Sequence, residues 1–226
     1  MPGHPALVAA LALTAAAACG EALSGPLRVT LTVPMPARVD TSGIRKILVT
    51  RFLVDKELPD VDLDKEMVSL LRREMRKKTD LEILNVEPPP LPEQPLADLL
   101  ANTGFWRRLA ESHGADLVIS GKVSFTVADR SGYVQQDAIS PVTGQRVRRT
   151  VFAEREGFTL DLSLFFLRGT TGQRLYEDHF TGQNTLSGQG NDRLTALFSL
   201  FEQFEDDVLG IVEPRARTAQ RILFTD

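Results

Sequence analysis

Residues 102–127, NTGFWRRLAESHGADLVISGKVSFTV, predict a short amphipathic helix followed by a long β-strand. Apolar residues recur at helical spacing in the first half, and Gly114 supplies the left-handed residue that commonly ends a helix. From Leu117 onward apolar residues alternate with polar or small ones, which is the period of a strand with one buried face. Such a strand needs a covering layer, so the rest of the chain is expected to supply one.

The flanking segments contain further strands and amphipathic helices. Strands are predicted at 28–33, 44–54, 81–86, 117–127, 157–167 and 174–181, and helices at 63–78, 102–113 and 192–211. This order predicts an α/β fold of one domain, in which about three helices pack on a mixed β-sheet. The proline-rich segment 88–95 is predicted to cross between elements as stiff polyproline, with a proline-rich docking ligand as the alternative. Residues 185–191 are predicted to form a polar loop.

Residues 129–156 form a polar interruption between two predicted strands of the sheet. Their arms, 133–139 and 146–153, flank the turn sequence SPVTG. Turn residues between two extended arms are typical of a β-hairpin. We therefore predict an extended hairpin that protrudes from the sheet.

Composition and residue pattern argue against several classes of function. A net charge of −4 and a pI near 5.5 provide no basic surface for nucleic acid. With one cysteine and three histidines the chain lacks a Cys and His metal cluster. We expect His113 at a helix end and His179 on a strand surface, neither of them paired with a nucleophile. These features predict a protein that is not an enzyme and holds no cofactor.

The acidic segment 60–64 imitates the opening of a calcium-binding loop. Its sequence is DVDLD, in which carboxylates recur at every second position. Glu66 occupies the position where such a loop requires glycine, and Leu71 replaces the glutamate that closes the loop. We therefore predict that these aspartates cap the helix at 63–78 and bind no metal.

The beginning of the chain carries the features of a lipoprotein leader. Residues 6–18 are rich in alanine and leucine, and the run is too short to span a bilayer. It ends in three alanines followed by Cys19, which resembles the lipobox of bacterial lipoproteins, where cleavage precedes a lipidated cysteine. The alternative is cleavage at an ordinary A-x-A site, which would leave Cys19 as a free thiol. The predicted parts are a signal peptide at 1–18, a lipidated tether at 19–27 and a periplasmic α/β domain at 28–226.

Three further segments resemble a superfamily of bacterial envelope lipoproteins. They are PARVDTSGIRKILVTRF, FWRRLAESHGADLVISGKV and VEPRARTAQRILF. The superfamily includes the curli-secretion channel lipoprotein, the lipoprotein activators of penicillin-binding proteins and the amino-terminal domain of the Tol-Pal propeller protein. In it a helix carrying G-A-D leads into a strand ending in G-K-V, as 114–116 and 121–123 do here. The resemblance implies the fold, and leaves the function open among channels, activators and adaptors.

The channel members of the superfamily pass hairpins through the outer membrane, and the predicted hairpin is unsuited to this. Each charge that faces lipid near the midplane would cost about 2–4 kcal/mol, and both arms carry polar residues on either face. A water-exposed hairpin that meets a partner remains, with a solvated hairpin without any partner as the alternative. The candidate partner-binding residues are Tyr133, Val134, Val147 and Arg148.

Together these observations predict a non-catalytic lipoprotein on the periplasmic face of the outer membrane. The lipid on Cys19, with palmitate-type acyl chains, would attach it to the membrane. Gly20, in place of an aspartate, favours transfer to the outer membrane by resemblance to such lipoproteins. The protein would be a binding or adaptor component of an envelope assembly, with an envelope protein as partner. The alternative is an oligomeric subunit of a secretion or polymer-export apparatus.

Overall fold

The structure is a computed structural model that describes residues 27–188 and 190–223. The chain divides into two compact units, of which the larger is Pro34–Ala216 and the smaller combines segments from both ends of the chain. The predicted signal peptide and the predicted lipidation site Cys19 lie outside the described residues. They stay predictions, as do the domain boundaries.

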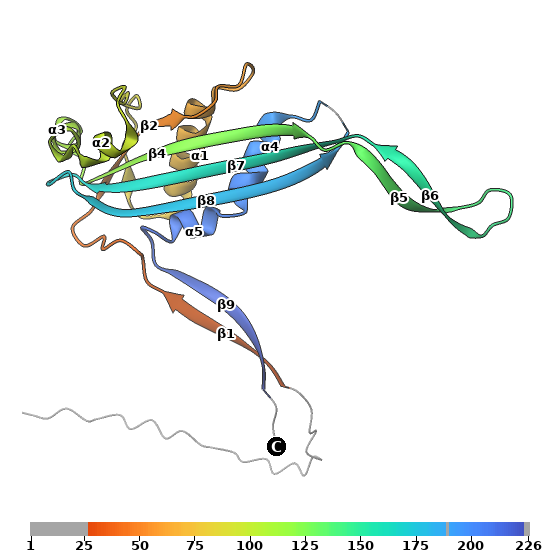
Figure 1. The fold of residues 1–226 in the computed structure, drawn as a ribbon. Coiled ribbons are helices and arrows are strands. Elements are labelled where there is room, and N and C mark those ends of the chain that lie inside the picture. Colours follow the sequence, from red (N-terminus) through yellow and green to blue (C-terminus); the bar gives the residue numbers. More distant parts are fainter. Residues whose placement is uncertain (1–26, 189, 224–226) are drawn as a thin grey trace, which may run out of the picture. The chain divides into compact units, whose positions relative to one another are not determined.

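A five-stranded mixed β-sheet forms the larger unit (Figure 1). The strand order is β3-β2-β4-β7-β8. Strand β2 is parallel to β3 and β4, whereas β7 is antiparallel to β4 and β8. This architecture confirms the predicted mixed α/β class. The strands are β2 (Lys46–Val54), β3 (Glu82–Ile83), β4 (Leu117–Asp129), β7 (Arg155–Arg168) and β8 (Arg174–Ser187).

Helices cover both faces of this sheet. One face packs against α1 (Leu63–Lys78), α4 (Arg193–Glu202) and α5 (Glu205–Leu209), which enclose the larger hydrophobic core. The other face packs against α2 (Leu96–Ala101) and α3 (Thr103–His113) over a smaller core. At its centre Trp106 is fully buried, and its indole N–H donates to the carbonyl of Leu99 at 2.8 Å. The alternation seen in the sequence of β4 therefore assigns its side chains to two cores.

The helices differ from prediction in two places. The predicted helix at 192–211 is divided into α4 and α5, because the intervening Phe204 leaves helical geometry with φ −126°. Helix α2 was not predicted, and the proline-rich segment leads into it. Pro89 is buried in that segment, and its carbonyl accepts a hydrogen bond from the Arg51 N–H at 3.1 Å. This contact supports the crossing interpretation of the segment over a docking ligand.

The strands also differ in extent. The predicted loop at 185–191 is wrong over its first three residues, because β8 continues and residues 185–187 pair with 155–157 of β7. Strand β3 is only two residues long, where 81–86 was expected. In both cases pairing with a neighbouring strand, which the local sequence does not encode, sets where the strand ends.

Two further pairs of strands form separate two-stranded sheets. The predicted hairpin is present as β5 (Gly132–Ile139) and β6 (Arg146–Ala153), joined in register from Gly132–Ala153 to Ile139–Arg146. Strand β1 (Leu27–Met35) confirms the predicted strand at 28–33 and pairs with β9 (Arg215–Leu223), which was not predicted. The first and last strands therefore form a ribbon of their own, named here the β1–β9 ribbon.

The residues of the G-A-D and G-K-V segments have structural roles. Gly114 ends α3 in the left-handed conformation, with φ 63°. The Asp116 carboxylate accepts the backbone N–H groups of Arg45 and Lys46 at 2.9 and 3.0 Å, which attaches the start of β2 to the start of β4. A Cβ on Gly121 would lie 2.1 Å from the ring of Phe52, so only glycine leaves room for that ring. These residues therefore define the fold.

The turn between β7 and β8 packs closely against the start of α3. Gly172 has φ +71°, and a Cβ on it would lie 1.9 Å from the carbonyl oxygen of Thr103. Gly144, in the hairpin turn, has nearly the same φ, +68°, but faces open space. The two glycines share the backbone constraint and differ only in crowding.

Replacing Gly172 with alanine is therefore expected to destabilise the protein more than replacing Gly144. Both changes force alanine into the left-handed region, at about 1–2 kcal/mol. Gly172→Ala adds a clash with a backbone atom, which should cost at least about 1 kcal/mol more. Urea unfolding of the two variants measures the difference. Equal free energies of unfolding would contradict the close packing of this turn.

The Asp116 carboxylate makes stability depend on pH. The N–H groups of Arg45 and Lys46 hold the pKa of this carboxyl below its ordinary value of 3.8. A group whose pKa is depressed by folding stabilises the fold above its unfolded-state pKa. That contribution disappears as the pH falls through the folded-state pKa.

We expect Asp116→Asn to lower the free energy of unfolding at neutral pH by about 1 kcal/mol, because an amide accepts these N–H groups more weakly. The difference from the unmodified protein should shrink below about pH 4. Urea titrations at several pH values measure both effects. Asp80→Asn serves as the control, because Asp80 is exposed and has no hydrogen bond or ion pair among the described residues. If the difference in free energy of unfolding between Asp116→Asn and the unmodified protein were the same at every pH, the Asp116 carboxylate would not be the source of the pH dependence.

Candidate functional site

The β5–β6 hairpin continues the β4–β7 pair past the end of the five-stranded sheet, in the direction of these two strands (Figure 1). Strand pairing is interrupted between the Asp129–Glu156 pair and the Gly132–Ala153 pair. Hydrogen bonds fill this joint: Arg130 N–H donates to the carbonyl of Arg155 at 2.9 Å, and Ser131 Oγ accepts the Arg155 N–H at 3.0 Å. One main-chain hydrogen bond and one to the Ser131 hydroxyl thus join the hairpin to the sheet.

The register sorts the hairpin side chains onto two faces, since directly paired residues share a face. We name them the aromatic face and the valine face. The aromatic face contains the pairs Tyr133–Phe152, Gln135–Thr150, Asp137–Arg148 and Ile139–Arg146. The valine face contains Gly132–Ala153, Val134–Val151, Gln136–Arg149 and Ala138–Val147.

This sorting separates the four candidate residues. Tyr133 and Arg148 lie on the aromatic face, whereas Val134 and Val147 lie on the valine face, so the four do not form one site. Both arms carry polar residues on either face, as predicted, although Gln136 and Arg149 form the one polar pair on the valine face. The sequence of one arm does not give the cross-strand pairs, because these depend on which residues of the two arms are opposed.

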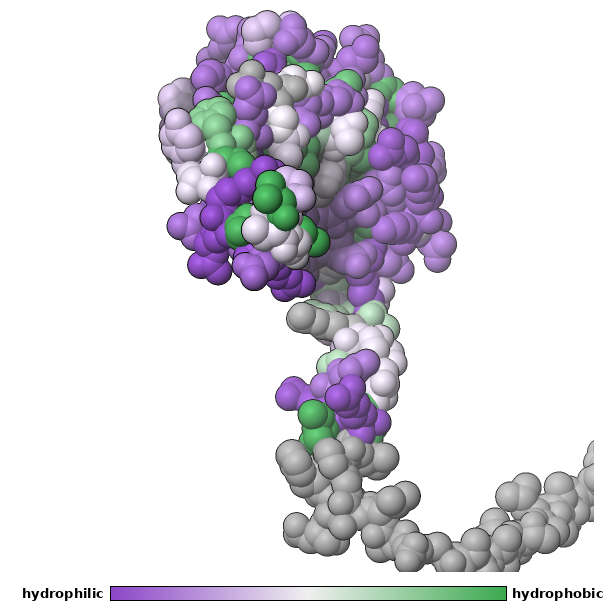
Figure 2. Space-filling view, turned by 90° about the vertical axis from the view of Figure 1, so that its right-hand side faces the viewer, coloured by the Kyte–Doolittle hydropathy of each residue, from purple (hydrophilic) through white to green (hydrophobic). Residues whose placement is uncertain are grey.

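The aromatic face and the turn carry the most exposed apolar side chains of the hairpin. Tyr133 is 80% exposed and Phe152 57%, and their rings meet edge to face with centroids 5.4 Å apart. Ile139 is 70% exposed, and Val142 in the turn 90%. Phe152, Ile139 and Val142 were not among the candidates, although each stands out as a large apolar residue in a polar segment. In Figure 2, which faces the hairpin side of the molecule, a small apolar group lies among polar residues.

Exposed apolar residues are concentrated in the two-stranded sheets. Among the residues that the structure describes, ten large apolar side chains are exposed; five belong to the hairpin and four to the β1–β9 ribbon. The remaining one is Val86. Scattered exposed apolar residues are ordinary on a protein surface, whereas gathered ones mark interaction sites. Aromatic residues beside arginine are also the composition of interface hot spots.

A Ser, His and Asp cluster lies on the open face of β7 and β8. Ser163 Oγ is 3.1 Å from His179 Nδ1, and His179 Nε2 is 3.8 Å from Asp161 Oδ1, with the Thr181 hydroxyl between them. His179 is on the strand surface as predicted, and its side chain is 59% exposed. Ser163 belongs to a strand paired on both sides, so neighbouring backbone N–H groups are engaged and offer no oxyanion hole. The cluster is therefore a set of surface hydrogen bonds with no oxyanion site beside Ser163.

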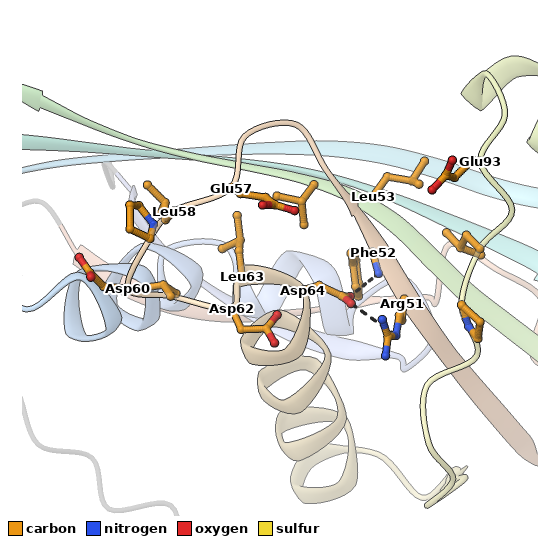
Figure 3. Close-up of a pocket in the computed structure, with 15 residues that line it drawn as sticks. Arg51, Phe52, Leu53, Glu57, Leu58, Asp60, Asp62, Leu63, Asp64 and Glu93 are labelled. Carbon is orange, nitrogen blue, oxygen red and sulfur yellow. Dashed lines mark hydrogen bonds and ion pairs between the residues drawn. The ribbon is translucent and has the colours of Figure 1, made fainter.

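A cleft of about 930 Å³ lies between the β2–α1 loop and residues 90–93 (Figure 3). Its carboxylates are largely engaged in structural contacts. Asp62 caps α1 by accepting the Lys65 N–H at 3.2 Å, which confirms the capping prediction, and Asp60 pairs with Arg193 at 2.9 Å. Asp64 accepts the Phe52 N–H at 2.6 Å, and burial raises the pKa of its carboxyl.

Residues 27–188 and 190–223 contain neither a candidate metal cluster nor a candidate membrane-spanning helix. No group of three or more His, Cys, Asp or Glu side chains is placed to hold a metal ion. No helix there has the length and apolar content to cross a membrane.

The fold is a mixed α/β domain with helices on both faces and a hairpin at one end. No protein-family model and no curated protein sequence matches the chain. Solved structures that are similar include the PelC dodecamer from Paraburkholderia phytofirmans, with 17% identity, a TM-score of 0.37, and coverage of 84% of this chain and 99% of PelC.

Two further solved structures are similar at the same distant level. A putative neuraminyllactose-binding hemagglutinin homolog from Helicobacter pylori has 9% identity and a TM-score of 0.48 over 78% of this chain and 87% of its own. Lipoprotein GNA1162 from Neisseria meningitidis has 12% identity and a TM-score of 0.38 over 72% of this chain and 99% of its own. Similarity this low transfers no function.

Proposed function

We propose that this protein is a non-catalytic lipoprotein that is anchored by Cys19 on the periplasmic face of the outer membrane and binds an envelope protein through its hairpin. The exposed Tyr133–Phe152 pair is the observation that carries the binding role. Two aromatic rings in mutual contact, with their outer surfaces in water, form a ready-made apolar contact area. The lipobox-like sequence that ends at Cys19 supports the anchor.

The flanking residues of the hairpin support recognition of a protein. Arg148 and Asp137 lie on the same face as the aromatic pair, beyond the Gln135–Thr150 pair, and are 3.4 Å apart with side chains 70% and 65% exposed. An ion pair this exposed adds little to stability, so both groups can form new polar contacts at little cost. Ile139 and Val142 extend the apolar surface toward the turn. Apolar groups at the base and at the turn of the hairpin, with polar pairs between them, provide the mixture of apolar and polar contacts that is typical of protein interfaces.

The anchor is tested by changing Cys19 and following the protein in cells. We expect Cys19→Ala to move the protein from the membrane fraction to a soluble fraction, because acyl chains supply membrane affinity at about 0.8 kcal/mol per buried CH2. Mass spectrometry of the unmodified protein should find lipid on Cys19. A Cys19→Ala protein that remains fully in membranes, or a Cys19 without lipid, would contradict the anchor.

The binding role is tested with a photo-crosslinking amino acid placed at Tyr133 or at Val147 in intact cells. We expect one specific adduct from the hairpin. Phe152→Ser should abolish it, because this change removes the ring that contacts Tyr133 and leaves the five-stranded sheet unaltered. Lys65, exposed on α1, is the matched control position and should give no such adduct. If neither hairpin position yields a specific adduct, the hairpin is not the binding site.

A second candidate function is that of an oligomeric subunit of a secretion or export apparatus. The observation in its favour is β8, a strand of 14 residues at the end of the sheet order. An edge strand offers backbone groups that another chain can pair with. Arg38 lies over part of this edge, where its guanidinium contacts Tyr176 and Asp178. In the same experiment, a crosslinker at Gln183 that joins two copies of the chain would favour this candidate.

A further inference from the structure

The β1–β9 ribbon carries several exposed apolar side chains. Leu31 is 46% exposed, Val33 48% and Met35 41%, and these three alternate along β1 and therefore share one face. Ile222 on β9 is 53% exposed. A two-stranded ribbon has no second layer to bury such residues, so this apolar surface is available to another phase or molecule.

The charge of the ribbon has one sign. Its two strands contain four arginines and no aspartate or glutamate, in a chain whose net charge is −4. Arg215 is engaged, since its guanidinium lies 2.5 Å from Asp206. Arg28 and Arg221 are exposed and have no ion pair among the described residues. Exposed cations beside exposed apolar groups are the combination that binds an anionic lipid surface.

The position of the ribbon in the chain indicates which lipid surface it would meet. Cys19, the proposed lipid anchor, precedes Leu27 by eight residues. Even fully extended, eight residues span only about 28 Å, so β1 starts within that distance of the anchored end. This step rests on the proposed anchor, whereas the exposure and charge of the ribbon do not.

We propose that the β1–β9 ribbon binds the anionic phospholipid surface of the membrane that holds the lipid anchor. Arg28 and Arg221 pair with lipid phosphates, and Leu31, Val33, Met35 and Ile222 enter the interface between headgroups and acyl chains. An acyl anchor becomes stable when a second membrane contact is added, and the ribbon supplies that contact. The ribbon is therefore a membrane-docking element, separate from the hairpin.

The test uses the chain from residue 19 to 226 carrying Cys19→Ser, which has no lipid and contains every described residue. Co-sedimentation with vesicles of phosphatidylethanolamine and phosphatidylglycerol should show binding, and vesicles with phosphatidylcholine in place of phosphatidylglycerol should show much less. Reversing two charges, with Arg28→Glu and Arg221→Glu together, should weaken binding at least roughly tenfold, and high salt should do the same.

Two matched variants keep the test specific. Arg146→Glu with Arg149→Glu makes the same charge change in the hairpin and should leave vesicle binding nearly unchanged. Leu31→Ser with Val33→Ser removes apolar area without altering charge and should also weaken binding. Circular dichroism checks that each variant keeps its fold. Equal binding to neutral vesicles, or loss of binding only in the hairpin variant, would overturn the proposal.

The vesicle test of the ribbon does not depend on whether Cys19 is lipidated. The vesicle measurement uses an unlipidated chain, whereas the anchor is judged by the mass of Cys19 from cells. If the unlipidated chain does not bind anionic vesicles and Cys19 from cells carries lipid, the proposed role of the ribbon is wrong and the lipid anchor is confirmed. An acidic protein partner for the ribbon would give that same result.

Discussion

The pairing of β4 with β7 is the constraint on which the rest of the structure depends. The two strands are in register from Leu117–Arg168 to Asp129–Glu156, so β4 is paired along its full length. Their alternating side chains supply one face to each hydrophobic core. Strands β2 and β8 add to the outer sides of this pair, and the hairpin continues from its far end. The helices on both faces thus pack against a platform, the five-stranded sheet, that has the β4–β7 pair at its centre.

Three residues of the G-A-D and G-K-V segments contribute to this platform. Gly114 ends a helix, Asp116 holds the first N–H groups of β2, and Gly121 leaves space for Phe52. A motif of this kind carries information about fold and little about function.

Much of the fold could be predicted because its strongest signals are local. Helix α1 was placed at its observed bounds, since apolar spacing and a capping aspartate both mark it. The features that escaped prediction depend on distant partners. Strand β9 contains alternating arginines that have no strand preference, and it is extended because β1 lies beside it. The hairpin itself could be predicted from its turn sequence, whereas the pairing of Tyr133 with Phe152 depends on the register of the two arms, which neither arm fixes alone.

The way the hairpin is attached has a consequence for its energetics. Beyond the hydrogen-bonded joint at Arg130 and Ser131, β5 and β6 have only each other, and a lone two-stranded sheet is marginally stable in water. Its arms can therefore separate locally while the platform stays folded. Any ligand that recognises the paired form must also select it from this equilibrium, which lowers the apparent affinity. Substitutions that strengthen pairing between the arms would then tighten recognition without adding a contact, so the strength of binding can be tuned from inside the hairpin.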